Sequence, residues 1–111
     1  MAKGDFLGEF EQLVLLALIR IGDEAYGLAV RREIEQRAER DVSIGAVYAT
    51  LDRLESKGLV KSRIEDGSAD RGGRPRKCFT ITATGGRALE KSQHTLRQML
   101  EGLPRRWNPS R

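Results

Sequence analysis

The stretch SIGAVYATLDRLESKGLV, residues 43–60, indicates the fold more clearly than any other part of the chain. Ser43 is a good N-cap residue, and Gly58 can take the left-handed backbone conformation that ends helices. Between them the apolar residues recur at the spacing of one helix face, at Val47, Leu51 and Leu54. The spacing therefore predicts a helix that opens at Ser43 and closes at Gly58.

Helical spacing also precedes this stretch, in two segments. From Phe6 to Ile21 the apolar residues surround nearly the whole helix, which is typical of a helix at the centre of a core or packed on two sides, one of them against another subunit. From Tyr26 to about Arg40 one apolar face stands opposite alternating charges. Three helices are therefore predicted in succession.

Downstream the period changes to two, which indicates a strand over residues 60–65 with Val60 and Ile64 on one side. The segment KCFTIT, residues 77–82, is rich in β-branched and aromatic residues and predicts a second strand. The two strands form a hairpin, and residues 66–76 form its long loop.

The segment DRGGRPRK, residues 70–77, covers the end of this loop and the first residue of the second strand, and it combines glycine and proline with positive charge. Two glycines and a proline exclude a helix there. The cations of this segment have only Asp70 as a local partner, so phosphate contact is favoured over a loop that is merely soluble. These cations are Arg71, Arg74, Arg76 and Lys77.

A last helix is predicted over residues 83–103, capped by Thr82 or Thr84. Its apolar residues exceed what a small three-helix core can cover, so we expect a dimer interface here, with folding back onto its own domain as the alternative. Residues 104–111 are expected to form a flexible tail. The apolar residues of the helix are Leu89, Leu96 and Leu103, spaced by sevens, with Met99 and Leu100 beside them.

Three helices, a hairpin with a basic tip and a further helix follow the order of a winged helix-turn-helix domain. The fold class is thus α+β and mainly α, with residues 6–82 as the DNA-binding domain, followed by the C-terminal dimerisation helix. In this fold the third helix lies in a major groove, while the hairpin tip, or wing, contacts phosphates or the neighbouring minor groove.

The charge distribution agrees with a polyanionic partner. Residues 1–41 hold nine acidic and six basic side chains, whereas residues 42–111 hold seven acidic and 14 basic ones. Nucleic acid is favoured over an acidic membrane, because no strongly basic amphipathic helix is present.

Other functions find little support in the sequence. Cys78 is the single cysteine, so an internal disulfide is excluded. Neither Cys78 nor the single histidine, His94, has neighbours at metal-ligand or catalytic spacing, so neither an enzyme nor a cofactor is expected. The apolar run Leu13–Ile19 is too short to span a bilayer and follows acidic residues, so an intracellular, cytoplasmic protein without a membrane partner is expected.

The face of the third helix opposite its apolar residues carries small side chains near its start, which would let DNA approach closely. Tyr48 and Arg53 can hydrogen-bond to phosphate or base there. Each has a structural alternative: Tyr48 can cover the edge of the core, and Arg53 can pair with a nearby carboxylate.

Three motifs together resemble the PadR family of bacterial transcriptional regulators over roughly residues 7–103. They are AYG at residues 25–27, the stretch at 43–60, and GGRPRKCFTITATG at 72–85. The most specific pattern is Gly-x-x-Tyr-x-x-Leu-x-Arg-Leu-Glu-x-x-Gly-Leu. It is followed in the same chain by a Gly-Arg-Pro-Arg-Lys wing and then by Thr-x-x-Gly. The sequence departs from the family at three positions: Ile44 and Ala49 replace frequent prolines, and Phe79 replaces a frequent tyrosine.

The resemblance implies a dimeric, repressor-like protein that binds a pseudo-palindromic operator through the third helix and the wing. It places Ser43, Gly45 and Tyr48 at helix positions that meet DNA, and Arg74 and Lys77 in the wing. A winged helix that serves only as a protein-interaction adaptor is the alternative function. Any small-molecule effector stays unidentified.

These interpretations give two sets of candidate residues. The candidate DNA contacts are Ser43, Gly45, Ala46, Tyr48, Ala49, Arg53, Arg71, Arg74, Arg76 and Lys77. The candidate contacts of a homodimer are Phe10, Leu13, Leu89, Leu96, Met99, Leu100 and Leu103.

Overall fold

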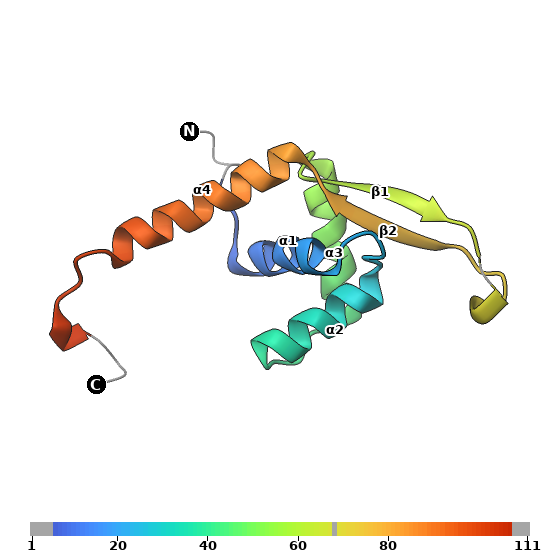
Figure 1. Cartoon of the computed structure of the whole chain (residues 1–111), viewed down its shortest axis with the longest axis horizontal. Helices are drawn as coiled ribbons and strands as arrows, with labels where there is room; N and C mark the ends of the chain where they lie inside the picture. The colour runs from blue at the N-terminus through green and yellow to red at the C-terminus, as the bar shows by residue number, and fades with distance from the viewer. Residues whose placement is uncertain (1–5, 68, 108–111) are drawn as a thin grey trace.

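The computed structural model describes residues 6–67 and 69–107, except for the side chain of residue 70. Within these residues the chain forms helices and one two-stranded antiparallel sheet, which confirms the predicted winged helix-turn-helix (Figure 1). The elements in chain order are α1 (Glu9–Ile21), α2 (Gly27–Ala38), α3 (Ile44–Ser56), β1 (Val60–Glu65), β2 (Arg76–Ile81) and α4 (Ala83–Leu100), with short 3-10 turns at Ala69–Arg71 and Arg105–Trp107.

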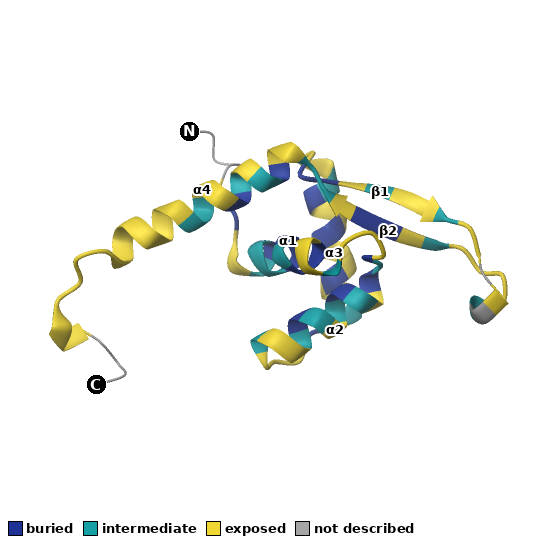
Figure 2. Cartoon of the chain, in the orientation of Figure 1, coloured by how far each residue is buried: buried dark blue, intermediate teal, exposed yellow. Residues whose placement is uncertain are grey.

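The core lies where the first three helices meet the base of the hairpin (Figure 2). Its fully buried side chains include Leu15 of α1, Leu51 of α3 and Phe79 of β2. The Phe79 amide donates to the Ala25 carbonyl at 2.9 Å, so the hairpin is joined to the loop between α1 and α2. One core therefore fixes the position of α3 relative to the wing.

Local signals set the bounds of α3 as predicted. The Ser43 hydroxyl oxygen accepts the Ala46 amide at 3.0 Å, which caps the first turn. After the helix, Gly58 has a φ of 76°, a conformation that favours glycine. The predicted roles of both residues are confirmed.

The first two helices are shorter than predicted. Helix α1 begins at Glu9 and not at Phe6, because Gly8 is the N-cap and its amide donates to the Glu11 carboxylate at 3.0 Å. Helix α2 ends at Ala38 and not near Arg40, because Glu39 turns to a φ of 52°.

The hairpin also differs from its prediction in detail. Strand β2 begins at Arg76, which pairs with Glu65, so Arg76 lies in the strand and not in the predicted loop, while Lys77 lies in the strand as predicted. The loop contains a 3-10 turn at Ala69–Arg71, where helical structure was excluded over residues 70–77. Val60 and Ile64 share a face, but only Val60 reaches the core; Ile64 is 65% exposed.

Helix α4 packs on the domain through its first half and then projects away from it (Figure 1). Gly85 and Leu89 are buried, whereas residues 94–107 are exposed. The helix ends at Leu100 instead of residue 103, and Gly102 follows with a φ of 76°. Of the predicted flexible tail, residues 104–107 include the second 3-10 turn, and residues 108–111 lie outside the described residues.

Candidate nucleic-acid interface

The first half of α3 presents a surface of small side chains. Ser43, Gly45, Ala46 and Ala49 are all exposed, while the opposite face of the helix is buried in the core. A ligand can approach the α3 backbone here more closely than it could past long side chains. These four predicted contacts therefore lie together on one accessible surface.

Tyr48 lies beside this surface and against the start of α2. Its side chain is partly exposed, at 43% for the residue. A Cβ atom on Gly27 would overlap the far end of the Tyr48 ring, so the ring packs directly on the Gly27 backbone. The ring thus covers an edge of the helical body and still presents an exposed side.

The wing tip carries two arginines whose charge is not neutralised by the described side chains. Arg71 donates from Nη2 to the Asp66 carbonyl at 2.7 Å and from Nε to the Arg74 carbonyl at 3.2 Å. Arg74 donates from Nε to the Arg71 carbonyl at 3.2 Å. These bonds to neutral carbonyl groups hold the tip in shape and leave its positive charge available to an anion.

Three other predicted contacts form ion pairs within the chain. Arg53 Nε lies 3.3 Å from a Glu11 oxygen, Arg76 Nη2 lies 3.7 Å from Glu24, and Lys77 Nζ lies 3.7 Å from Glu55. The Arg76 guanidinium also stacks on the Tyr26 ring, 4.0 Å from its centroid. The structure therefore separates the wing-tip arginines from three cations whose charge is partly neutralised.

Glu11 and Glu55 belong to the site, and sequence reasoning missed both. Glu11 holds Arg53 and Lys57, while Glu55 accepts from the Ser62 hydroxyl and pairs with Lys77, which links α3 to both strands. The one sequence signal was an acid at position 11, close to the apolar run Leu13–Ile19.

The candidate dimer contacts fall into three groups. Leu89 is only 6% exposed and lies in the core of its own chain. Phe10 and Leu13 of α1 are half-buried against that core. The remaining four are exposed large apolar side chains: Leu96, Met99, Leu100 and Leu103.

Other chemistry finds no site in the part of the chain that the structure describes. It contains no group of three or more His, Cys, Asp or Glu side chains able to hold a metal ion. Nor does it contain a helix long and apolar enough to cross a bilayer. Cys78 is buried and its thiol donates to Glu65; burial, together with the Glu65 carboxylate, raises the pKa of the thiol.

Comparison with known proteins agrees with this geometry. A PadR-family transcription regulator from Clostridium difficile is 26% identical, with a TM-score of 0.70 over 85% of this chain and 93% of that one. A PadR-family regulator from Eggerthella lenta is 27% identical, with a TM-score of 0.66 over 85% of this chain and 81% of that one. No curated protein matches the sequence.

The family itself is identified by a match that spans most of the domain. The family model described as "Transcriptional regulator PadR-like family" matches residues 15–91. That range runs from α1 through the wing to the first half of α4. The chain therefore belongs to the PadR-like family of transcriptional regulators.

Proposed function

We propose that this protein is a sequence-specific DNA-binding regulator that represses transcription from a pseudo-palindromic operator as a homodimer. The observation that carries the proposal is the pairing of two surfaces. The same domain carries the small-residue face of α3 and, at the end of the hairpin, a wing tip whose arginines, Arg71 and Arg74, are bonded to carbonyl groups and to no described carboxylate. A protein-interaction adaptor would have no need of that charge.

The two surfaces suit different parts of a duplex. The first half of α3 can enter a major groove because its exposed residues are small, and base edges are read there. The wing arginines would hold phosphates on the flanking backbone, which positions the protein without reading sequence. Specificity would thus arise at α3 and much of the affinity at the wing.

A homodimer would supply the required selectivity, because one winged helix reads too few base pairs to select one site in a genome. The second half of α4 is the candidate seam. Leu96, Met99 and Leu100 are 55%, 73% and 63% exposed on a helix that projects from its domain. A contiguous apolar surface of this kind indicates a protein contact. The same surface on a second copy of the chain could cover it across a twofold axis.

Repression would follow from occupancy. A dimer seated on an operator inside a promoter would block access of the polymerase to the same DNA. A reporter gene behind a promoter that contains the selected site should be transcribed less when the protein is present, and more when it is absent.

Selection of duplexes from a random pool tests the proposal directly. We expect enrichment of an inverted repeat whose half-sites lie about one helical turn apart, because each protomer would present one α3 to one groove. The variant Arg71→Gln/Arg74→Gln should recover the same repeat with weaker binding. A pool without any enriched sequence would reject sequence-specific binding and favour the adaptor function.

A further inference from the structure

Glu11 of α1 is an ionisable side chain buried against α3. Among the described residues, it and Thr50 are the polar or charged side chains that are buried. One carboxylate oxygen accepts the Gly8 amide at 3.0 Å. The other oxygen accepts from Arg53 Nε at 3.3 Å and Lys57 Nζ at 3.0 Å. A single carboxylate on α1 therefore holds two cations of α3.

The carboxylate stays ionised at neutral pH. Burial raises the pKa of Glu11, but the Gly8 amide, Lys57 and Arg53 together outweigh burial, so that its pKa lies below the ordinary value. Glu11, Arg53 and Lys57 together carry a net charge of +1, whereas the two cations alone would present a charge of +2 to DNA.

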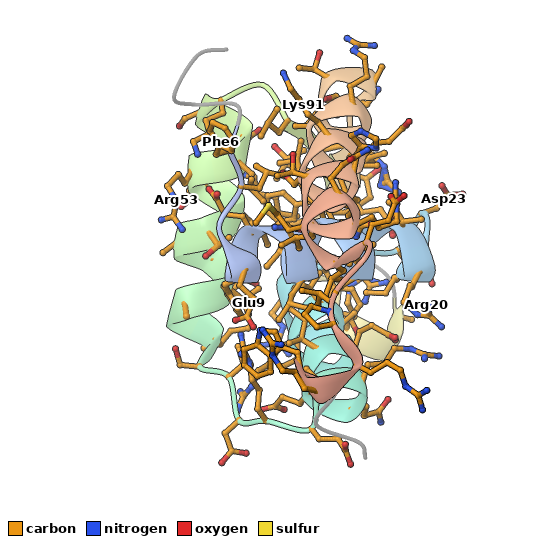
Figure 3. All side chains as sticks on the ribbon, turned by 90° about the vertical axis from the view of Figure 1, so that its left-hand side faces the viewer. Phe6, Glu9, Arg20, Asp23, Arg53 and Lys91 are labelled. Carbon is orange, nitrogen blue, oxygen red and sulfur yellow. The ribbon has the colours of Figure 1, made fainter. Side chains whose placement is uncertain are left out.

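Two hydrogen-bond partners orient the Arg53 side chain. Besides Glu11, its Nη2 donates to the Thr50 hydroxyl oxygen at 3.3 Å. The side chain is still 51% exposed and lies on the outer side of α3 (Figure 3). An unpaired arginine at this position would be attracted to phosphate next to any base sequence, because phosphate contacts carry no sequence information.

We propose that Glu11 is a positioning residue that withholds Arg53 and Lys57 from the DNA backbone and so sets the ratio of specific to non-specific binding. This inference rests on the proposed DNA-binding function and deepens it. The first half of α3 reads bases through its small residues, while the cations of its second half are kept from adding affinity for every sequence.

The test variant is Glu11→Gln, which removes the charge but keeps the side-chain size and an oxygen for the Gly8 amide. Glu33→Gln is the matched control. Glu33 also bridges two arginines, with Arg20 at 3.3 Å and Arg37 at 3.1 Å. It lines a groove formed only by residues of α1 and α2, and Arg20 lies on the opposite side of the molecule from Arg53 (Figure 3).

Affinity for a duplex of random sequence is measured between 50 and 200 mM salt, after sedimentation shows that each variant keeps the oligomeric state of the wild type. Releasing two cations in each protomer of a dimer should steepen the log-log salt dependence of Glu11→Gln by up to about four contacts, a loss of affinity on the order of a hundredfold greater over this range. Glu33→Gln should keep the wild-type slope. Adding Arg53→Gln and Lys57→Gln to the Glu11 variant should restore it.

A slope for Glu11→Gln equal to that of Glu33→Gln overturns the inference. If Glu11→Gln does not fold, Arg53→Gln/Lys57→Gln with Glu11 intact decides the question. An unchanged slope supports the inference, and a slope shallower by up to about four contacts per dimer overturns it, because the cations would then already hold phosphates. Absence of duplex binding by the wild type at 50 mM salt is a different result, which overturns the proposed function and this inference with it.

Discussion

Gly85 and Gly86 are adjacent in α4, yet their surroundings differ. A Cβ atom on Gly85 would overlap the Leu59 carbonyl oxygen and lie 2.9 Å from Ile81 Cγ1. A Cβ atom on Gly86 would have no neighbour within 4 Å. The Gly85 amide also donates to the Thr82 hydroxyl oxygen at 3.0 Å, so the Thr-x-x-Gly motif both caps α4 and lets it touch the chain before β1.

Replacing these glycines should therefore change stability in opposite directions. Gly85→Ala should lower the free energy of unfolding by about 1–3 kcal/mol, because a backbone carbonyl cannot move aside cheaply. Gly86→Ala should raise it by about 0.5–1 kcal/mol through better helix propensity. Chemical denaturation of the two variants checks this. Equal effects would show that α4 does not approach Leu59 closely.

The Glu11 carboxylate should make stability depend on acid pH. Its pKa in the folded protein lies below its ordinary value of 4.5, so its contribution is complete above that value and is lost as the pH falls through the lowered pKa. The free energy of unfolding should decline below about pH 4.5 more steeply for the wild type than for Glu11→Gln. Denaturant titrations from pH 6 to pH 3 measure this. Identical slopes for the two proteins would contradict the ion cluster.

At the scale of elements, the hairpin is held at the loop end of its strands by contacts distant in sequence. The Arg76 side chain is 21% exposed, stacks on Tyr26 and pairs with Glu24. Its Nε is buried and has no hydrogen-bond partner among the described residues. These contacts indicate that Arg76 anchors the hairpin to the helical body, whereas Arg74 lies at the exposed tip.

Arg76→Lys should therefore loosen the wing although it keeps the charge, because lysine lacks the planar group that stacks on the ring. Hydrogen exchange of the β1 and β2 amides should become faster in this variant. The control Arg74→Lys at the tip should leave exchange unchanged. Equal protection of the strands in both variants would contradict the anchoring role.

How well the sequence predicts an element depends on where its signals lie. The bounds of α3 follow from Ser43 and Gly58, which act on neighbouring backbone, and both were predicted. The start of β2 at Arg76 depends on Tyr26 and Glu24, which are distant in sequence, so the strand was predicted one residue late. The same distant contacts moved Arg76 from the predicted loop into the strand.

At the scale of the whole molecule, the sequence predicted a basic half but not where its charge is neutralised. Acids of the N-terminal half reach cations of the C-terminal half, as Glu11 does with Arg53 and Glu24 with Arg76. Packing of α1 and the α1–α2 loop against α3 and the hairpin creates these pairs. Only the folded chain shows that Arg53 and Arg76 are paired with acids while Arg71 and Arg74 at the wing tip are bonded to carbonyl groups instead.

The projecting half of α4 leads to a prediction about assembly. Leu96→Glu/Leu100→Glu should yield a soluble monomer that retains its helices, because these exposed residues would place charge in a subunit seam while the core stays intact. Gln98→Glu on the opposite face of α4 is the control and should remain dimeric. Sedimentation at micromolar concentration measures both. A wild-type protein that is already monomeric there would contradict the homodimer.

The salt dependence of duplex binding by the wild-type protein tests the central claim most directly. If the wings and α3 of two protomers neutralise several phosphates, affinity should fall linearly on a log-log plot and by on the order of a thousandfold between 50 and 200 mM salt. Fluorescence anisotropy of a labelled duplex that carries the selected repeat gives the measurement. A flat plot, or no binding at 50 mM salt, would contradict DNA binding through this surface.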